Sequence, residues 1–346
     1  MRHSNIELLR IYAMFFIVWG HIWAAKIDSA SAPFLAHLLV NSVGIGVVDI
    51  FILITGYFLI QRQEFTLVRF FKILFEVMFY NFIIVAVAVA LGKAPGKDLV
   101  ICLFPLAPTK FNAWFVSQYL ALILIQPFIS RFVPALTRTQ YRALLCVLLL
   151  LTTVLVPGFP LGYLYSSSWK VSWFITLFLA GGYIRIYGIP QLHRWIYVSL
   201  FVAMSIVWTM SYFFGPAEIG YNSLLTFCVA VLLLCIALKF DIGSVRAVNW
   251  ISSSTFAAYL IHQNFYMIKT FSWLIPTPMG TGFTAVLLSG LLYMSIFFMA
   301  MVLVDKVRIA IFKACHIDQF EGWLSDRLIS LFRSIIGFGK PLSIRR

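Results

Sequence analysis

The chain has 346 residues, of which 62% are hydrophobic and only 11% are charged, and its mean hydropathy is +0.96. A soluble domain is typically about half apolar and about a quarter charged. These values exclude a cytosolic enzyme, a disordered chain and a small disulfide-bonded scaffold. They predict an integral membrane protein.

Apolar segments follow one another along most of the chain. A transmembrane helix needs about 20 mostly apolar residues, and the segments near this length lie at 6–25, 38–60, 68–91, 113–130, 143–158, 171–187, 195–214, 222–238, 251–274 and 282–304. The first segment lacks a small-residue cleavage site, so we interpret it as a retained span. We predict an all-α integral membrane protein with about ten transmembrane helices.

The basic residues indicate which side of the membrane each loop faces. The net charge is +14. With the N-terminus in the cytoplasm, 19 of the 26 Lys and Arg residues fall in inner segments and five in outer segments. Cytoplasmic segments are enriched in these residues. We therefore predict that both termini are cytoplasmic, and we interpret the charge as orientation, with no nucleic-acid partner.

The first span carries three ionisable residues on one face. Arg10 and His21 are 11 residues apart, which is about three helical turns, and Glu7 lies one turn before Arg10. An ionisable residue within a span costs roughly 2.5–3.5 kcal/mol, so such residues are functional candidates. The structural alternative is that these side chains extend to the headgroups on either side.

The second and third spans add further polar candidates. Asp49 has apolar neighbours in sequence and therefore needs a cation, a hydrogen-bond donor or water, whereas Gly56 favours close helix approach. In the third span, Arg69 and Lys72 share a face, and Glu76 lies one turn further on. Basic residues at a cytoplasmic helix start are often only membrane anchors, which is the alternative for this pair.

The ninth span places Tyr259 and His262 three residues apart near the middle of the membrane. A hydrogen-bonded packing role is as plausible for this histidine as a chemical one.

Beyond the spans, the chain divides into a membrane domain, 1–305, and a basic cytoplasmic tail, 306–346. Residues 306–336 alternate apolar and basic at roughly helical spacing, which is typical of an interfacial amphipathic helix attracted to anionic lipid. The five cysteines form no CxxC pair and have no His spacing suited to zinc, so we expect no metal site.

The order of the polar phrases resembles the membrane-bound acyltransferase type 3 family over residues 4–305. Three positions depart from the usual phrases: Thr55 where Ser is common, Ala257 where Gly is common, and Lys72 where many members have an arginine cluster. The phrases that carry the resemblance are Glu7-x-x-Arg10-(x)10-His21, Asp49-Ile50-Phe51 with Thr55-Gly56-Tyr57, Trp114-Phe115 with Tyr119-Leu120, Gly181-Gly182-Tyr183, and Ser254 to His262.

The resemblance implies an O-acyltransferase, most often an O-acetyltransferase, in a bacterial plasma membrane. It implies acetyl-CoA or another acyl-CoA as co-substrate, no tightly bound cofactor, and a carbohydrate acceptor, namely a hydroxyl of a cell-surface glycan or of its lipid-linked precursor.

The resemblance also implies roles for individual residues. His21 would be the general base or acyl carrier, Arg10 would hold a donor phosphate with help from Arg69 and Lys72, and Asp49 would orient His21. The candidates for substrate contact or structural support are Glu7, Glu76, Trp114, Tyr119, Tyr259 and His262.

A secondary transporter is the main alternative, with Arg10, His21 and Asp49 as a proton relay for export of a sugar or polysaccharide. The phrase order favours the enzyme, as does the lack of the internal repeat that many transporters have. A receptor or scaffold without chemistry leaves the shared face of Arg10 and His21 unexplained. Acetyl and succinyl both remain open for the acyl group, as do direct transfer and an acyl-histidine intermediate.

Overall fold

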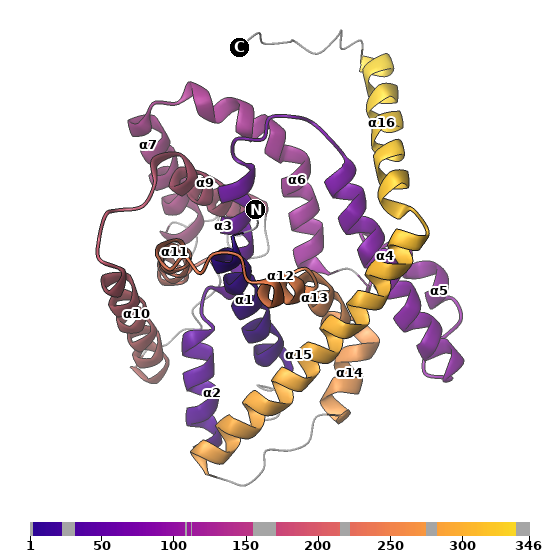
Figure 1. Cartoon of the computed structure of the whole chain (residues 1–346), viewed down its shortest axis with the longest axis horizontal. Coiled ribbons are helices and arrows are strands. Elements are labelled where there is room, and N and C mark those ends of the chain that lie inside the picture. The colour runs from indigo at the N-terminus through magenta and orange to yellow at the C-terminus, as the bar shows by residue number, and fades with distance from the viewer. Residues whose placement is uncertain are drawn as a thin grey trace.

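The computed structural model describes residues 3–22, 32–107, 109–111, 113–154, 171–214, 222–274 and 282–336, and the regular elements within them are helical (Figure 1). They are α1 (Ser4–Ile22), α2 (Ala32–Val43), α3 (Val47–Leu59), α4 (Val68–Ala90), α5 (Asp98–Ile101), α6 (Trp114–Phe132), η2 (Val133–Ala135), α7 (Arg138–Leu149), η3 (Leu150–Val154), α9 (Val171–Tyr187), α10 (Arg194–Phe214), α11 (Leu224–Lys239), α12 (Arg246–Ser252), α13 (Thr255–Gln263), α14 (Phe265–Leu274), α15 (Phe283–Ala314) and α16 (Ile317–Ile336).

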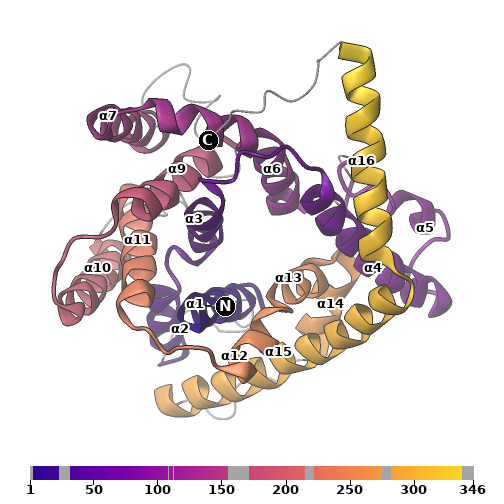
Figure 2. The same ribbon diagram turned by 45° about the horizontal axis from the view of Figure 1, so that its top comes forward.

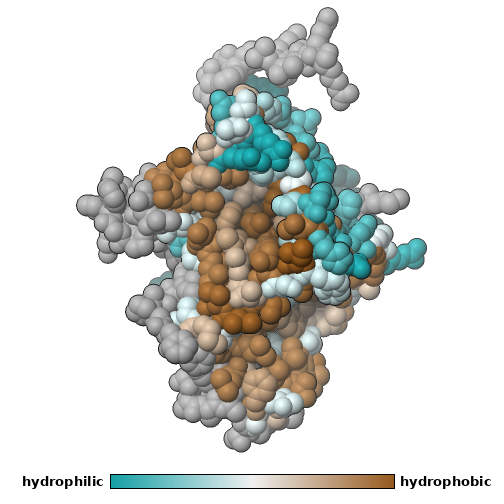
Figure 3. All heavy atoms as spheres, turned by 90° about the vertical axis from the view of Figure 1, so that its left-hand side faces the viewer, coloured by the Kyte–Doolittle hydropathy of each residue, from teal (hydrophilic) through white to brown (hydrophobic). Residues whose placement is uncertain are grey.

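Several helices have the length and composition of membrane spans. Two shorter apolar helices, α9 and α11, lie among them. Figure 3 shows a broad apolar surface on one face, with hydrophilic residues gathered toward its upper and right-hand edges. The all-α multi-pass prediction agrees with this architecture, while the number ten stays a prediction. Within the described residues, six segments are long and apolar enough to cross a bilayer: Ser4–Ile22, Leu38–Leu59, Val68–Ala90, Trp114–Ala135, Arg194–Ser211 and Phe283–Ala314.

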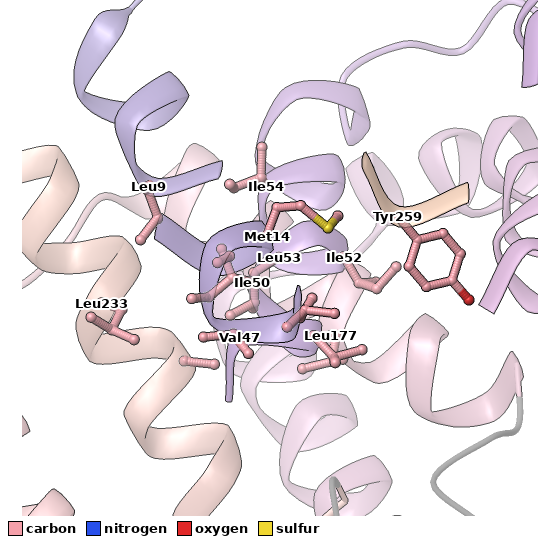
Figure 4. Packing of buried hydrophobic residues seen from close by; sticks show 14 of the residues in the cluster. Leu9, Met14, Val47, Ile50, Ile52, Leu53, Ile54, Leu177, Leu233 and Tyr259 are labelled. Atoms are coloured by element: carbon pink, nitrogen blue, oxygen red, sulfur yellow. The ribbon is translucent and has the colours of Figure 1, made fainter. Parts of the chain in front are cut away.

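Helices α1 and α3 lie at the centre of the bundle, and the other long helices surround them (Figure 2). Their apolar side chains form the main core, in which Met14 of α1, Leu53 of α3 and Leu177 of α9 are buried together (Figure 4). Since α1 and α3 have protein on most sides, several of their polar residues, among them Glu7, Asp49 and Thr55, are buried within the protein.

Glycines bring the backbones of α3 and α9 into direct contact. A Cβ atom added at Gly56 would lie 2.0 Å from Phe178 O, and one added at Gly181 would lie 2.0 Å from Leu53 O. Such distances leave no room for any side chain. The expected close approach at Gly56 is therefore confirmed, and small residues here allow the two helices to pack as tightly as helix pairs in membranes often do.

The ninth predicted span, 251–274, is not one helix but three, α12, α13 and α14. Serines 252–254 mark the first break, and hydroxyl side chains of this kind compete with helical backbone hydrogen bonds. Asn264 makes the second break, because its backbone is extended and its Oδ1 accepts a hydrogen bond from Tyr266 N. Both breaks place polar groups inside the bundle.

Three predicted segments can be compared with the helices: the fifth span, the membrane domain and the amphipathic tail. Residues 143–154 of the fifth predicted span are helical but change to a π-helix at Leu150, and residues 155–158 lie outside the described part of the chain. Helix α15 continues through the predicted boundary at 305 to Ala314. The amphipathic tail helix is α16, which packs on α4 with the rings of Phe320 and Phe75 stacked 5.8 Å apart.

The glycine contact yields a prediction of stability. Gly181→Ala should lower the midpoint of thermal unfolding in detergent, because the added methyl group overlaps Leu53 O and overpacking typically costs about 1–3 kcal/mol. Gly322→Ala is the matched control, since a Cβ atom there meets nothing within 4 Å. Equal midpoints for the two variants would contradict the close contact.

Candidate active site

A cavity of about 370 Å³ lies between α1, α3, α4, α6 and the α12–α13 region. It is lined by nine of the eleven residues that the sequence singled out, whereas Asp49 and His262 do not line it. The nine residues are Glu7, Arg10, His21, Arg69, Lys72, Glu76, Trp114, Tyr119 and Tyr259.

One end of this cavity, which we call the basic end, is formed by the first turns of α1 and α4. Arg10 Nη1 lies 2.9 and 3.1 Å from the two carboxylate oxygens of Glu7. Ser252 at the end of α12 donates a further hydrogen bond to Glu7. These contacts hold Arg10 at the cavity wall, where about a third of its side chain remains exposed.

A buried ionic cluster fixes the other carboxylate of the basic end. Glu76 Oε1 lies 3.4 Å from Arg308 Nη2, and Arg308 Nε lies 2.6 Å from Asp305 Oδ1. Tyr80 donates to the same Asp305 oxygen at 2.7 Å. Each carboxylate that lines the cavity is thus already bound to a guanidinium group. Arg69 and Lys72 also line the cavity, and Lys72 is close enough to Glu76 and Glu321 to interact with them electrostatically.

His21 lies at the opposite end of the cavity and is oriented by α13. His262 Nδ1 lies 2.7 Å from Ala258 O, and since a carbonyl only accepts, this nitrogen carries the proton. The neutral ring of His262 then accepts at Nε2, which lies 3.0 Å from His21 Nδ1. His21 Nδ1 also contacts the side-chain amide nitrogen of Gln263, so residues of α13 hold the imidazole from two directions.

An aromatic wall runs between the two ends of the cavity. Phe115 stacks on Tyr119 with ring centroids 5.7 Å apart and contacts Tyr259 at 5.6 Å. The Tyr119 hydroxyl lies 3.1 Å from Thr55 Oγ1, which itself donates to Phe51 O. Tyr119 is thus the donor of the pair. These rings give the cavity an aromatic surface between the basic end and His21.

Asp49 is placed apart from the residues it was grouped with. Its carboxylate is buried, and Oδ1 accepts a hydrogen bond from Trp173 Nε1 at 3.1 Å. It makes no contact with His21, whose ring nitrogens instead meet His262 and Gln263. The proposed orienting role of Asp49 has no contact to support it.

Sequence reasoning missed three residues of this site. Gln263 contacts the His21 imidazole, Ser252 binds Glu7, and Arg308 neutralises Glu76. Gln263 and Ser252 are uncharged, and Arg308 follows the last predicted span, so none had the intramembrane charge that drew attention to the others. The helix breaks beside Ser252 and Gln263 are the signal that would have found those two.

A family model described as an acyltransferase domain, Acyl_transf_3, matches residues 3–304. The chain therefore belongs to the acyltransferase 3 family, and the protein is a multi-pass membrane acyltransferase that uses an acyl donor. The family predicted from the order of the sequence phrases is thus confirmed. Comparisons with curated proteins and with solved structures found no match.

The buried ionic cluster generates a second prediction. Arg308→Ala should lower the thermal midpoint in detergent strongly, because it leaves Glu76 and Asp305 buried without their cation, and breaking such a pair costs about 3–5 kcal/mol. Arg333→Ala on the exposed face of α16 should leave the midpoint unchanged. A similar midpoint for both variants would show that Arg308 does not neutralise these carboxylates.

Proposed function

We propose that this acyltransferase moves an acetyl group from cytoplasmic acetyl-CoA to a hydroxyl of a cell-surface glycan or of its lipid-linked precursor. The observation that supports this most directly is that Arg10 and His21, at the two ends of one face of α1, line the same cavity. A helix rises 1.5 Å per residue, so their backbones are about 16 Å apart. The cavity thus extends from the basic end to the imidazole of His21.

The basic end suits the nucleotide part of the donor. Acetyl-CoA carries phosphate groups, and Arg and Lys bind phosphate through charge-assisted hydrogen bonds. Arg69 and Lys72 face the cavity, while Arg308 holds Glu76. Arg10 retains further guanidinium donors beyond those that contact Glu7. This arrangement gives an anionic donor three cations at one mouth of the cavity.

The distribution of basic residues supports a cytoplasmic position for this mouth. Positive residues concentrate on the cytoplasmic side of membrane proteins, and the first turns of α1 and α4 lie beside basic loops of the chain. In this orientation the His21 end faces the extracytoplasmic side. The donor would then enter from inside and the acceptor from outside.

We assign the chemistry at His21 to Nε2, because Nδ1 is the nitrogen that contacts His262. The acceptor hydroxyl attacks the thioester carbonyl carbon and gives its proton to Nε2, so that a C–O bond forms and the C–S bond breaks. CoA leaves as the thiolate and takes the proton back from the imidazolium to become the thiol. His262 stabilises the imidazolium through His21 Nδ1. In the acyl-carrier variant, Nε2 attacks the thioester first and the acceptor then attacks the acyl-imidazole.

A chromosomal His21→Ala change tests the proposed reaction. We expect alkali-labile acetate on the surface glycan to fall by about 10²-fold or more, because general-base catalysis is worth about 10²–10⁴-fold. Protein abundance in the membrane should not change. His193→Ala is the matched control, since this histidine is exposed and outside the cavity.

Two outcomes of the His21→Ala experiment would contradict the proposal. Full acetate on the glycan would exclude His21 as base and as acyl carrier. Unchanged acetate per unit of polymer, together with loss of surface polymer, would indicate an exporter.

The donor site generates a separate kinetic prediction. Arg69→Gln with Lys72→Gln should raise the apparent KM for acetyl-CoA about tenfold to a hundredfold, because hydrogen bonds to charged groups are worth about 1.5–3 kcal/mol. The KM is measured from the rate at which the purified protein in lipid nanodiscs releases the CoA thiol. Arg62→Gln is the control and should leave the KM for acetyl-CoA unchanged, because Arg62 is an exposed loop residue that does not line the cavity. An unaltered KM in the double variant would remove this pair from the donor site.

A further inference from the structure

A second, smaller cavity of about 80 Å³ lies beside the His21 end of the first. The two cavities share the side chains of Trp114 and Tyr259 as walls. The second cavity has none of the residues of the basic end. Its polar residues are instead amides and one lysine: Asn81, Gln263, Asn264 and Lys110.

Asn81 lines this cavity and carries a buried hydrogen-bond donor that is unpartnered among the described residues. Asn264 Oδ1 accepts from Tyr266 N, so the other amide atom of Asn264 is its nitrogen, which donates to Asn81 Oδ1 at 3.0 Å. This fixes the Asn81 amide with Nδ2 as the remaining donor. Among the described residues Nδ2 has no partner, although only 7% of Asn81 is exposed. Burying an unsatisfied donor is costly, which indicates a site for an acceptor atom from a ligand.

Gln263 connects this cavity to the reacting imidazole. Its side-chain amide lines the second cavity and contacts His21 Nδ1. Gln263 thus links the lining of the second cavity to the imidazole that takes up the proton in the proposed reaction.

The charge of Lys110 is already neutralised. Lys110 Nζ pairs with Asp98, which Tyr266 also contacts through its hydroxyl group. Burial raises the pKa of Asp98, but the hydrogen bonds from Lys110 and Tyr266 outweigh this effect and lower it. The ammonium group lies over the rings of Phe265 and Tyr266, each 4.9 Å from the centroid. The cavity therefore offers amides and aromatic surface, without a free charge for an acidic ligand.

We infer that the second cavity is the acceptor subsite and that it binds the neutral, hydroxyl-bearing edge of a sugar residue. Asn81 Nδ2 donates to an oxygen atom adjacent to the hydroxyl that His21 deprotonates, and the rings of Trp114, Tyr259 and Phe265 cover the apolar face of the sugar. The volume suits one edge of a ring and not an oligosaccharide. This inference rests on the proposed function and deepens it by assigning where the acceptor binds.

The test uses the full-length protein in lipid nanodiscs, acetyl-CoA, and the surface glycan of the same cells after mild alkaline removal of its acetyl groups. Asn81→Leu, which keeps the volume and removes the donor, should raise the KM for the glycan about tenfold. The KM for acetyl-CoA should not change. Asn249→Leu, at a half-buried asparagine of α12 that lines neither cavity, controls for the loss of an amide.

A second measurement needs no variant and therefore does not depend on how Asn81→Leu folds. Saturating glycan should slow the modification of Lys110 by an amine-reactive reagent several-fold, as read by mass spectrometry. The exposed Lys93 serves as the internal control and should react at the same rate with and without glycan.

The outcomes separate the inference from the proposed function. Transfer by the wild type, with an unchanged glycan KM in folded Asn81→Leu or with unprotected Lys110, would overturn the subsite and leave the proposed reaction intact. Absence of acetyl transfer to the glycan by the wild type would overturn both.

Discussion

The low polarity of the bilayer interior requires every buried ionisable group to have a partner, and this constraint shapes the site. Glu7 is bound by Arg10, and Glu76 by Arg308. Arg69 and Lys72, which also line the cavity, are outside these two pairs. The same pairs that make the charges tolerable in the fold therefore also decide which charges remain available to a ligand.

Helix packing places the two ends of the cavity. The backbone contact between α3 and α9 at Gly56 and Gly181 leaves α3 fixed beside α1, with Thr55 directed at Tyr119. On the other side, α16 covers α4, and Ser325 accepts a hydrogen bond from Leu67 N at the start of that helix. Arg69 and Lys72 thus lie on a helix that packs against α16, α13 and α6.

Much of this site is predictable from the local sequence. Contacts that depend on how helices pack against one another are not. Helical periodicity is enough to put Arg10 and His21 on one face, and the cavity includes both. Periodicity could not show that His262 rather than Asp49 would meet His21, because that depends on how α13 packs on α1. The division of 251–274 into three helices was missed for a similar reason, since its apolar composition is that of a continuous span.

A small hydrophobic cluster apart from the main core joins α4 to the region between α4 and α6, and its buried residues are Val85, Cys102 and Phe111. It meets the rest of the bundle through Val85 of α4 and Tyr266 of α14. Phe111 belongs both to this small core and to the lining of the second cavity, so a substitution that repacks the core also reshapes that cavity.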